Sequence, residues 1–205
     1  MPGLDVFYPI VPDLAWLERV AGLGARTIQL RMKDVSDAEI AATVKASLAT
    51  CAAAGCQLIV NDYWRIAIDC GADFIHLGQE DLASADRAAI KASGARLGVS
   101  THSLEELDVA LAASPDYVAL GPIYETKLKK MKWQPQGLDR LGEWRTVIGN
   151  LPLVGIAGIT VERADGVMDA GADSVAVITD FLTHPDPDAR LREWLAWAET
   201  RREAR

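Results

Sequence analysis

Short apolar runs alternate with segments of helical periodicity along the whole chain. Each run spans four to six residues, and after most of them apolar residues recur three and four positions apart. A short apolar run is typical of a buried strand, and the wider spacing is typical of a helix with one apolar face. The runs are Val6–Val11, Thr27–Leu30, Gln57–Val60, Phe74–Leu77, Arg96–Val99, Tyr117–Leu120, Leu153–Ile156 and Ser174–Ile178. The pattern therefore predicts eight strands that alternate with helices.

Capping signals mark several helix ends. Two Ser-x-x-Glu sequences, beginning at Ser36 and Ser103, have the form of a capping box. The helix that begins at Ser36 is predicted to run to Ala54, immediately before a glycine. Thr160 is predicted to cap a later helix. The residues from Asp188 onward predict an amphipathic, tryptophan-rich helix at the C-terminus.

The alternation predicts an α/β protein, a single (β/α)₈ TIM barrel domain over residues 1–205. An open doubly wound sheet is the competing architecture. The count of eight strands and the lack of a G-x-G-x-x-G turn favour the barrel, although the chain is at the short end of the barrel size range. One long polar connection, residues 122–136, predicts a mobile lid loop.

Composition narrows the class of protein further. The 205 residues are 50% hydrophobic and 24% charged, with a net charge of −8, which argues against a general nucleic-acid binder. No apolar run approaches the ~20 residues of a membrane helix, and the N-terminus carries no export signal. Cys51, Cys56 and Cys70 lack a C-x-x-C pair and predict free thiols. We therefore expect a cytoplasmic protein; the oligomeric state stays open.

Two successive strands each end near a carboxylate. Asp62 follows the third apolar run and Asp81 follows the fourth. Neighbouring parallel strands end at the same edge, so both carboxylates are expected to converge at the barrel mouth, where the chemistry of this fold is found. Paired hard oxygen ligands that leave room for substrate phosphates suit Mg²⁺. Asp62 alone could simply cap the next helix, but the second carboxylate at Asp81 favours the metal site.

Three polar residues occupy every second position from the second predicted strand into the segment that follows it. Gln29, Arg31 and Lys33 are two residues apart and are expected to point the same way along an extended segment. Two cations aimed into a barrel mouth suit a polyanion such as diphosphate. Solvated surface charge is the alternative, but it does not explain the glutamine on the same side.

The loop after the sixth strand is locally basic. Residues 121–137 contain four lysines and one glutamate, a local charge of +3 in a protein of net charge −8. Long loops in compact domains are usually functional lids or disordered. A lid that brings a lysine onto phosphates fits the pattern; a solvated flexible loop is the alternative, and it is preferred for three of the four lysines.

The turns after the last two strands suit a phosphate. Gly158 and Thr179 are in the positions where barrels of this fold bind phosphate with backbone N–H groups, although tight turns without a ligand explain them equally well. His76 and His102 lie near the expected mouth, and either could be a general base. We expect His76 to be a hydrogen-bonded structural residue at a strand end.

Several segments together resemble one known family, thiamine-phosphate synthase, also called thiamine-phosphate pyrophosphorylase. No single segment is specific, but the set covers nearly the whole chain in order. The segments are QLRMKD (29–34), NDYWRIAI (61–68), HLGQEDL (76–82), LGVSTH (97–102), ALGPIY (119–124), TKLK (126–129), PQGL (135–138) and VAVIT (175–179).

The resemblance implies a (β/α)₈ transferase of thiamine biosynthesis. Such an enzyme joins hydroxymethylpyrimidine diphosphate to a thiazole phosphate, either hydroxyethylthiazole phosphate or its carboxylated precursor, and releases thiamine phosphate and diphosphate. Mg²⁺ is the implied cofactor, and the implied partners are small-molecule substrates, with no nucleic acid or membrane.

The resemblance also implies roles for particular residues. Asp62 and Asp81 are the implied metal ligands. Arg31, Lys33 and Lys129 are implied to stabilise the departing diphosphate. The full implied substrate-binding set is Gln29, Arg31, Lys33, Asn61, Ser100, Thr126, Lys129, Ala157, Gly158, Ile178 and Thr179. The chemistry needs no covalent nucleophile, because an electron-rich aminopyrimidine can carry positive charge on the carbon that loses diphosphate.

Three positions depart from the family pattern. Leu128 replaces a second lid threonine, Ala157 replaces the first of two glycines, and Thr179 replaces a serine. These changes fall on the lid and thiazole-phosphate side, whereas the metal and diphosphate side is intact. Two alternatives therefore stay open beside the synthase: a paralogue resembling thiazole tautomerase, and a non-catalytic barrel that binds a thiazole phosphate.

Overall fold

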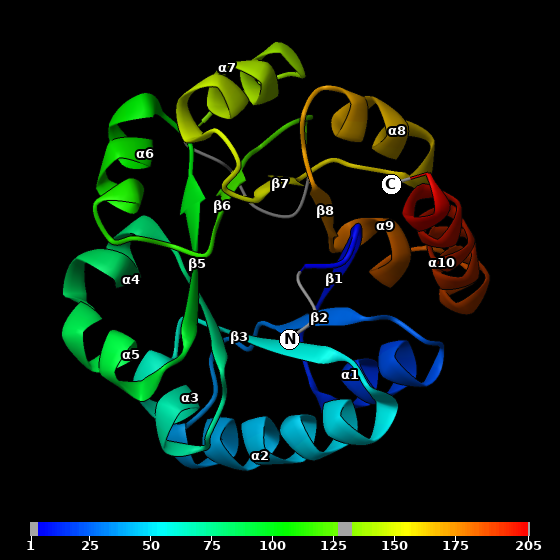
Figure 1. Ribbon diagram of the computed structural model, residues 1–205. Helices are drawn as coiled ribbons and strands as arrows, with labels where there is room; N and C mark the ends of the chain where they lie inside the picture. The colour runs from blue at the N-terminus through cyan, green and yellow to red at the C-terminus, as the bar shows by residue number, and fades with distance from the viewer. Residues whose placement is uncertain (1–3, 127–132, 205) are drawn as a thin grey trace.

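The strands close into a parallel barrel. The computed structural model describes residues 4–126 and 133–204. Each strand pairs in parallel with the next along the chain, and β1 pairs with β8 to close the ring (Figure 1). The strands are β1 Phe7–Val11, β2 Thr27–Leu30, β3 Gln57–Asn61, β4 Phe74–Leu77, β5 Arg96–Thr101, β6 Tyr117–Leu120, β7 Leu153–Ile156 and β8 Ser174–Val177. The barrel prediction is confirmed, and the open-sheet alternative is wrong.

Helices surround this barrel as an outer ring (Figure 1). Within the described residues they are α1 Leu14–Gly22, α2 Asp37–Ala54, α3 Trp64–Asp69, α4 Gln79–Ser84, α5 Arg87–Ser93, α6 Leu104–Leu111, α7 Asp139–Ile148, α8 Val161–Asp169, α9 Thr179–Leu182 and α10 Pro187–Glu203. No helix in the described part of the chain is long and apolar enough to cross a membrane.

The capping signals predicted from sequence form to different degrees. Ser36 makes the complete capping box with Glu39 at the start of α2. Ser103 accepts a hydrogen bond from the backbone N–H of Glu106 at 3.3 Å, but the Glu106 carboxylate instead accepts from the backbone N–H of His102. Thr160 is the N-cap residue of α8, yet its side chain makes no capping hydrogen bond.

Buried side chains form two layers, one on each side of the strands. The larger layer packs the strands against the helices and includes the fully buried Trp144 and Trp194. The smaller layer fills the inside of the barrel, as is typical of this fold. It consists of Tyr8, Ile10, Ile59, Phe74, Tyr117, Ala119, Val154 and Ala176. The barrel interior is therefore a packed core, and in this fold ligand sites lie at the rim formed by the carboxyl ends of the strands.

Candidate active site

Two carboxylates meet at the rim formed by the carboxyl ends of the strands. Asp62 immediately follows β3, and Asp81 lies in the first turn of α4, just after β4. Burial raises the pKa of Asp81, and the neighbouring Asp62 charge and a hydrogen bond shared with Asp62 raise it further. The two side chains, which are 19 positions apart in the sequence, therefore lie close enough for the charge of Asp62 to raise the pKa of Asp81.

Lys33 joins this acidic pair. Its Nζ lies 2.6 Å from Oδ2 of Asp62. The Asp62 side chain is only 13% exposed, whereas Lys33 is 49% exposed. The ammonium group therefore sits on the solvent side of a largely buried carboxylate and offsets part of the like-charge repulsion between the two acids.

Asp62 has an unfavourable backbone conformation. Its φ of 70° lies in the left-handed region, which costs a residue with a Cβ roughly 1 kcal/mol. Its N–H donates to the carbonyl oxygen of His76 at 2.9 Å. The N-cap residue of α3 is Tyr63, and that helix has no side-chain cap. The alternative of Asp62 as a helix cap is therefore wrong, and its side chain is turned to Lys33 and Asp81.

Gln29, Arg31 and Asn61 border the same rim at different depths. Gln29 is buried, and its amide Nε2 donates to the hydroxyl of Tyr8 at 2.7 Å inside the barrel. Arg31 is half-buried, and its N–H donates to the carbonyl oxygen of Val11 at 2.8 Å. Asn61 is the buried last residue of β3. Arg31 and Lys33 follow Gln29 along the chain, just beyond the end of β2.

His76 is a buried neutral residue. Its Nδ1 lies 2.6 Å from the hydroxyl of Tyr117, and its Nε2 lies 2.8 Å from Oγ of Ser100. Burial lowers the pKa of His76 to about 4, with the charge of Arg31 lowering it further and that of Asp62 opposing the shift. The prediction that His76 is hydrogen-bonded near a strand end is confirmed.

The side chain of His102 contacts Glu106 and Trp133. Its Nδ1 lies 2.7 Å from the carboxylate of Glu106, and its ring stacks on Trp133 with the ring centres 5.8 Å apart.

Two tyrosines inside the barrel were missed by the sequence analysis. Tyr8 and Tyr117 lie in apolar strand runs, and their hydroxyl groups are 2.8 Å apart. A tyrosine within a run that otherwise fills a barrel interior carries a polar group needing a buried partner. That signal was present in the sequence, but strand register was needed to identify the partners.

The turn after β7 fits closely against the loop after β6. Ala157 and Gly158 have φ values of 77° and 68°. A Cβ at Gly158 would lie 2.5 Å from the carbonyl oxygen of Glu125. The N–H of Tyr124 donates to the carbonyl oxygen of Ala157 at 3.1 Å. Glycine is therefore required at position 158, and Ala157 adopts the left-handed conformation that glycine would take more easily.

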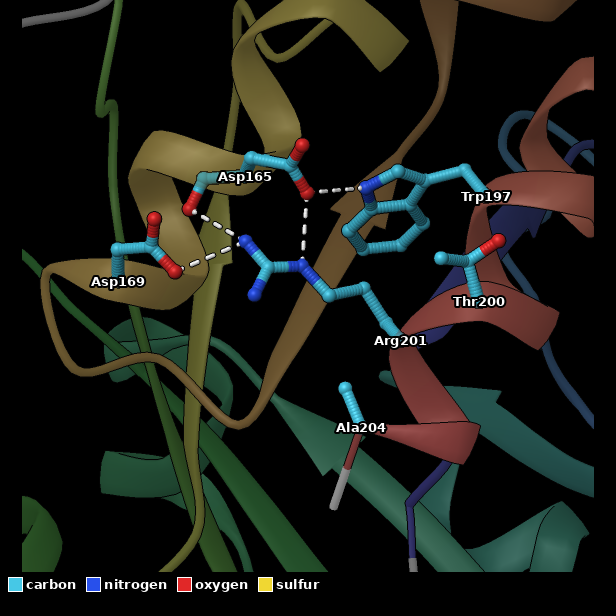
Figure 2. Close-up of a pocket in the computed structure, with 6 residues that line it drawn as sticks. All are labelled: Asp165, Asp169, Trp197, Thr200, Arg201 and Ala204. Atoms are coloured by element: carbon cyan, nitrogen blue, oxygen red, sulfur yellow. Dashed lines mark hydrogen bonds and ion pairs between the residues drawn. The ribbon is translucent and has the colours of Figure 1, made fainter.

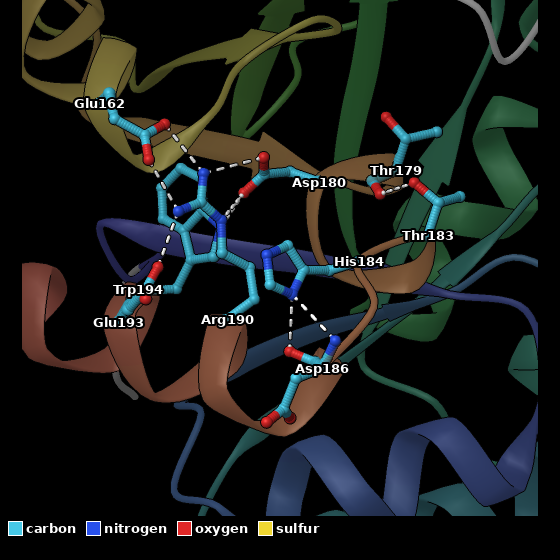
Figure 3. A network of polar contacts seen from close by, with 9 residues as sticks. All are labelled: Glu162, Thr179, Asp180, Thr183, His184, Asp186, Arg190, Glu193 and Trp194. Carbon is cyan, nitrogen blue, oxygen red and sulfur yellow. Dashed lines mark hydrogen bonds and ion pairs between the residues drawn. The ribbon is translucent and has the colours of Figure 1, made fainter.

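A polar network lies beneath the turn after β8 (Figure 3). Ile178 and Thr179 are half-buried, and Thr179 begins α9. The next residue, Asp180, accepts hydrogen bonds from Arg190 Nε and from Trp194 Nε1, each at 2.7 Å. Arg190 also binds Glu162 of α8 with both terminal nitrogens, at 2.7 and 2.8 Å. One arginine thus connects α8, α9 and α10 next to Thr179.

Part of the expected lid lies outside the described residues. Thr126 is the last described residue before the gap and is half-buried. Leu128 and Lys129 lie outside the described residues, as do the other three lysines of the basic cluster.

The oxygen ligands fit a divalent ion that shares its coordination with a substrate. In the described residues there is no group of three or more histidine, cysteine, aspartate or glutamate side chains able to hold a metal. Asp62 and Asp81 supply two hard carboxylate ligands. Mg²⁺ is commonly bound in this way, by one or two carboxylates together with waters and substrate phosphates. Burial is the largest cause of the raised pKa of Asp81, and the Asp62 charge is the next; a nearby cation would offset both.

A hollow of about 400 Å³ lies far from this rim, between the ends of α8 and α10 (Figure 2). It is lined by Asp165, Asp169, Trp197, Thr200, Arg201 and Ala204. The Arg201 guanidinium is bound to Asp165 and Asp169 at 2.7 and 2.8 Å. Because α8 ends just before β8 begins, this hollow belongs to the opposite end of the barrel.

Comparisons with known proteins agree on one family. Residues 7–181 match the family described as thiamine monophosphate synthase. A thiamine-phosphate synthase of Rhizobium etli is 58% identical over 193 residues, covering 94% of this chain and 95% of that protein. One from Salmonella paratyphi B is 46% identical over 93% of this chain and 90% of that protein. The solved structure of a thiamine phosphate pyrophosphorylase from Pyrococcus furiosus has a TM-score of 0.81 at 26% identity, covering 95% of each chain.

Proposed function

The chain belongs to the thiamine monophosphate synthase family and is a transferase of thiamine biosynthesis, and we propose how its rim residues carry out the reaction. The thiamine-phosphate synthase activity couples a hydroxymethylpyrimidine diphosphate to a thiazole phosphate and releases diphosphate. The metal, the residue roles and the identity of the thiazole partner are the proposal.

One observation carries the assignment of roles. Asp62 and Asp81 lie together at the carboxyl ends of β3 and β4, and Lys33 is bound to one of them at 2.6 Å. A bare pair of carboxylates would repel a diphosphate. Asp62 and Asp81 would hold Mg²⁺, whose charge would offset theirs, and Arg31 and Lys33 would bind the diphosphate.

The reaction requires stabilisation of the leaving group above all. The bond that breaks joins the pyrimidine CH₂ to a diphosphate oxygen, and the electron-rich ring supports positive charge on that carbon. Asp62 and Asp81 would hold Mg²⁺, which would supply electrostatic stabilisation of the diphosphate. Arg31 and Lys33 add fixed positive charge from the protein. Lys129, which lies outside the described residues, is proposed to add a third cation.

The pyrimidine is held by neutral groups deeper in the mouth. Asn61 and Ser100 are at the ends of β3 and β5, with Gln29 below them. These groups orient the ring so that its CH₂ faces the thiazole nitrogen, and this positioning replaces covalent catalysis.

The thiazole phosphate is assigned to the turns after β7 and β8. Ala157 and Gly158 expose backbone there, and Ile178 and Thr179 begin the adjacent short helix. Thr126 lies at the start of the neighbouring loop. The replacement of serine by Thr179 keeps the hydroxyl group, and Ala157 keeps its N–H.

The test is a coupling assay with purified protein, both substrates and Mg²⁺, following release of diphosphate. We expect turnover that EDTA abolishes and added Mg²⁺ restores. Turnover that persists in EDTA would remove the metal from the proposal. Binding of the thiazole phosphate without any turnover would support the tautomerase-like or non-catalytic alternatives instead.

A further inference from the structure

A continuous chain of hydrogen bonds crosses the interior of the barrel and ends at the rim. It consists of Gln29, Tyr8, Tyr117, His76 and Ser100, and we refer to it as the interior polar chain. Successive contacts measure 2.7 Å from Gln29 to Tyr8, 2.8 Å between the tyrosine hydroxyls, 2.6 Å to His76 Nδ1 and 2.8 Å from His76 Nε2 to Ser100 Oγ. Each member comes from a different strand.

Proton counting gives this chain one direction. The Gln29 amide N–H donates to the Tyr8 oxygen, so the single Tyr8 proton is donated onward to Tyr117. Tyr117 then accepts from Tyr8 and donates its own proton to Nδ1 of His76. Because Nδ1 is an acceptor, the neutral imidazole carries its proton on Nε2 and donates it to Ser100.

Other proton arrangements leave a buried group without a partner. An imidazolium would donate to Tyr117 from Nδ1, and the proton of one tyrosine would then have no acceptor. The reversed chain would aim the Tyr8 proton at the Gln29 N–H. An unpaired hydroxyl or two opposed donors in a fully buried site is costly. With the Gln29 amide N–H directed at the Tyr8 oxygen, only the direction from Gln29 to Ser100 satisfies every contact.

The surrounding packing holds the chain in place. The Tyr117 ring stacks on His76 with ring centres 5.5 Å apart and an angle of 18° between the rings. Its other neighbours meet it edge-on, Tyr8 at 6.1 Å and Phe74 at 5.6 Å. A Cβ at Gly98 would lie 2.1 Å from the Tyr117 ring. The glycine therefore provides the space that lets this ring reach His76.

The direction matters at the last member of the chain. Once the Ser100 oxygen accepts from Nε2 of His76, the hydroxyl proton of Ser100 remains available for a ligand at the mouth. We propose that Tyr8 and Tyr117 are positioning residues that hold His76 as the Nε2–H tautomer and thereby make Ser100 a hydrogen-bond donor to an acceptor atom of the pyrimidine substrate. The identity of that ligand rests on the proposed function, whereas the direction of the chain does not.

The tautomer can be measured directly. Nitrogen-15 NMR of the histidine side chains distinguishes a protonated from an unprotonated ring nitrogen, and comparison with His76→Gln assigns the His76 signals among the three histidines. We expect a neutral ring with the proton on Nε2. A proton on Nδ1, or an imidazolium at neutral pH, would overturn the proposal even if the protein couples its substrates normally.

The tyrosine variants test the link to substrate. Tyr117→Phe keeps the ring and removes the donor to Nδ1. We therefore expect that His76 is no longer held as the Nε2–H tautomer alone, so that its NMR signals change. We also expect KM for the pyrimidine diphosphate to rise about tenfold, as for one lost hydrogen bond, with KM for the thiazole phosphate unchanged. General destabilisation would not produce that split.

Tyr63→Phe is the matched control for the tautomer, because the Tyr63 hydroxyl donates to Met32 at 3.4 Å outside the chain. Unchanged kinetics in Tyr117→Phe would refute the positioning role. If the tautomer is Nε2–H but the protein does not couple its substrates, the proposed function fails and the chain's direction stands.

Discussion

Single residues at the rim have unfavourable backbone conformations or unfavourable charges, and substitutions can test each of these separately. Asp62 and Ala157 both have positive φ values, and Asp81 has a raised pKa beside a like charge. Such features persist where the surrounding structure fixes them, and they cluster at functional sites. Asp62, Asp81 and Ala157 are therefore the residues at which substitutions can test a trade-off between stability and function.

Asp81→Asn should reduce coupling activity roughly 100-fold while leaving the protein as stable as before or more stable. Because the folded-state pKa of Asp81 is raised, its protonated form favours folding at low pH, and that contribution is lost as the pH rises through the raised pKa. At neutral pH the ionised Asp81 therefore opposes folding, and asparagine removes that effect. Thermal unfolding without metal, measured beside the coupling rate, checks both parts.

The control for Asp81→Asn is Glu80→Gln, which neutralises the exposed neighbouring carboxylate in the same helical turn. It should leave the coupling rate close to that of the wild type. If Asp81→Asn turns over normally, the metal assignment falls; if Glu80→Gln is equally inactive, net charge rather than ligation explains the effect.

Gly158→Ala should destabilise the protein by about 2 kcal/mol or more, since the new Cβ meets the backbone of the loop after β6 at 2.5 Å. We also expect a raised KM for the thiazole phosphate. The neighbouring Ala157→Gly has a similar φ but adds no atom, and its effect on unfolding should stay within about 1 kcal/mol. Denaturant unfolding of both variants checks the contrast, and equal effects would contradict it.

At the scale of elements, the strand and helix boundaries followed from local sequence with small differences at their ends. The apolar run at Gln57 extends one residue further, to Asn61, and the run at Arg96 extends to Thr101. The capping box at Ser36 formed as predicted, whereas Glu106 was diverted to His102. Local propensity specifies an element, but a side chain at its end goes to whichever partner the fold brings near.

Arg190→Leu should destabilise the protein by about 3–5 kcal/mol. The substitution leaves the Asp180 carboxylate, which is only 11% exposed, without its main partner. The exposed Arg192→Leu, two residues along α10, is the control and should change unfolding little. Because Asp180 adjoins Thr179, the first variant should also weaken thiazole-phosphate binding. Calorimetry and steady-state kinetics test these expectations, and a stable Arg190→Leu would contradict the structural role.

The same arginine makes an acid-sensitive link to α8. Hydrogen bonding to Arg190 and to Thr160 lowers the pKa of Glu162 to about 2. A lowered carboxyl pKa stabilises the fold above the unfolded-state value, and that stability is lost as the pH falls from about 4.5 toward 2. Glu162→Gln should therefore unfold with a flatter pH dependence in this range. If Glu162→Gln lost stability over the same acid range as the wild type, the proposed role of the Arg190–Glu162 interaction would be contradicted.

At the scale of the whole molecule, the repeated strand pattern was predicted from the sequence, whereas the contacts that form inside the closed barrel were missed. Eight apolar runs gave the barrel, and the positions of Asp62 and Asp81 after adjacent strands placed them at one rim. The contact between Tyr8 and Tyr117 joins positions 109 apart and depends on register around the closed ring. No local pattern encodes such a contact, so the interior polar chain could not be predicted before the fold was known.

The central claim is that the two rim carboxylates hold a divalent ion against a diphosphate. The most direct measurement is anomalous diffraction from crystals grown with Mn²⁺ and diphosphate, because manganese replaces magnesium and can be located by its scattering. The account predicts one anomalous peak bound by both Asp62 and Asp81, with a diphosphate oxygen completing the contact and Arg31 and Lys33 beside it. A bound diphosphate with no metal between it and these two carboxylates would contradict the account.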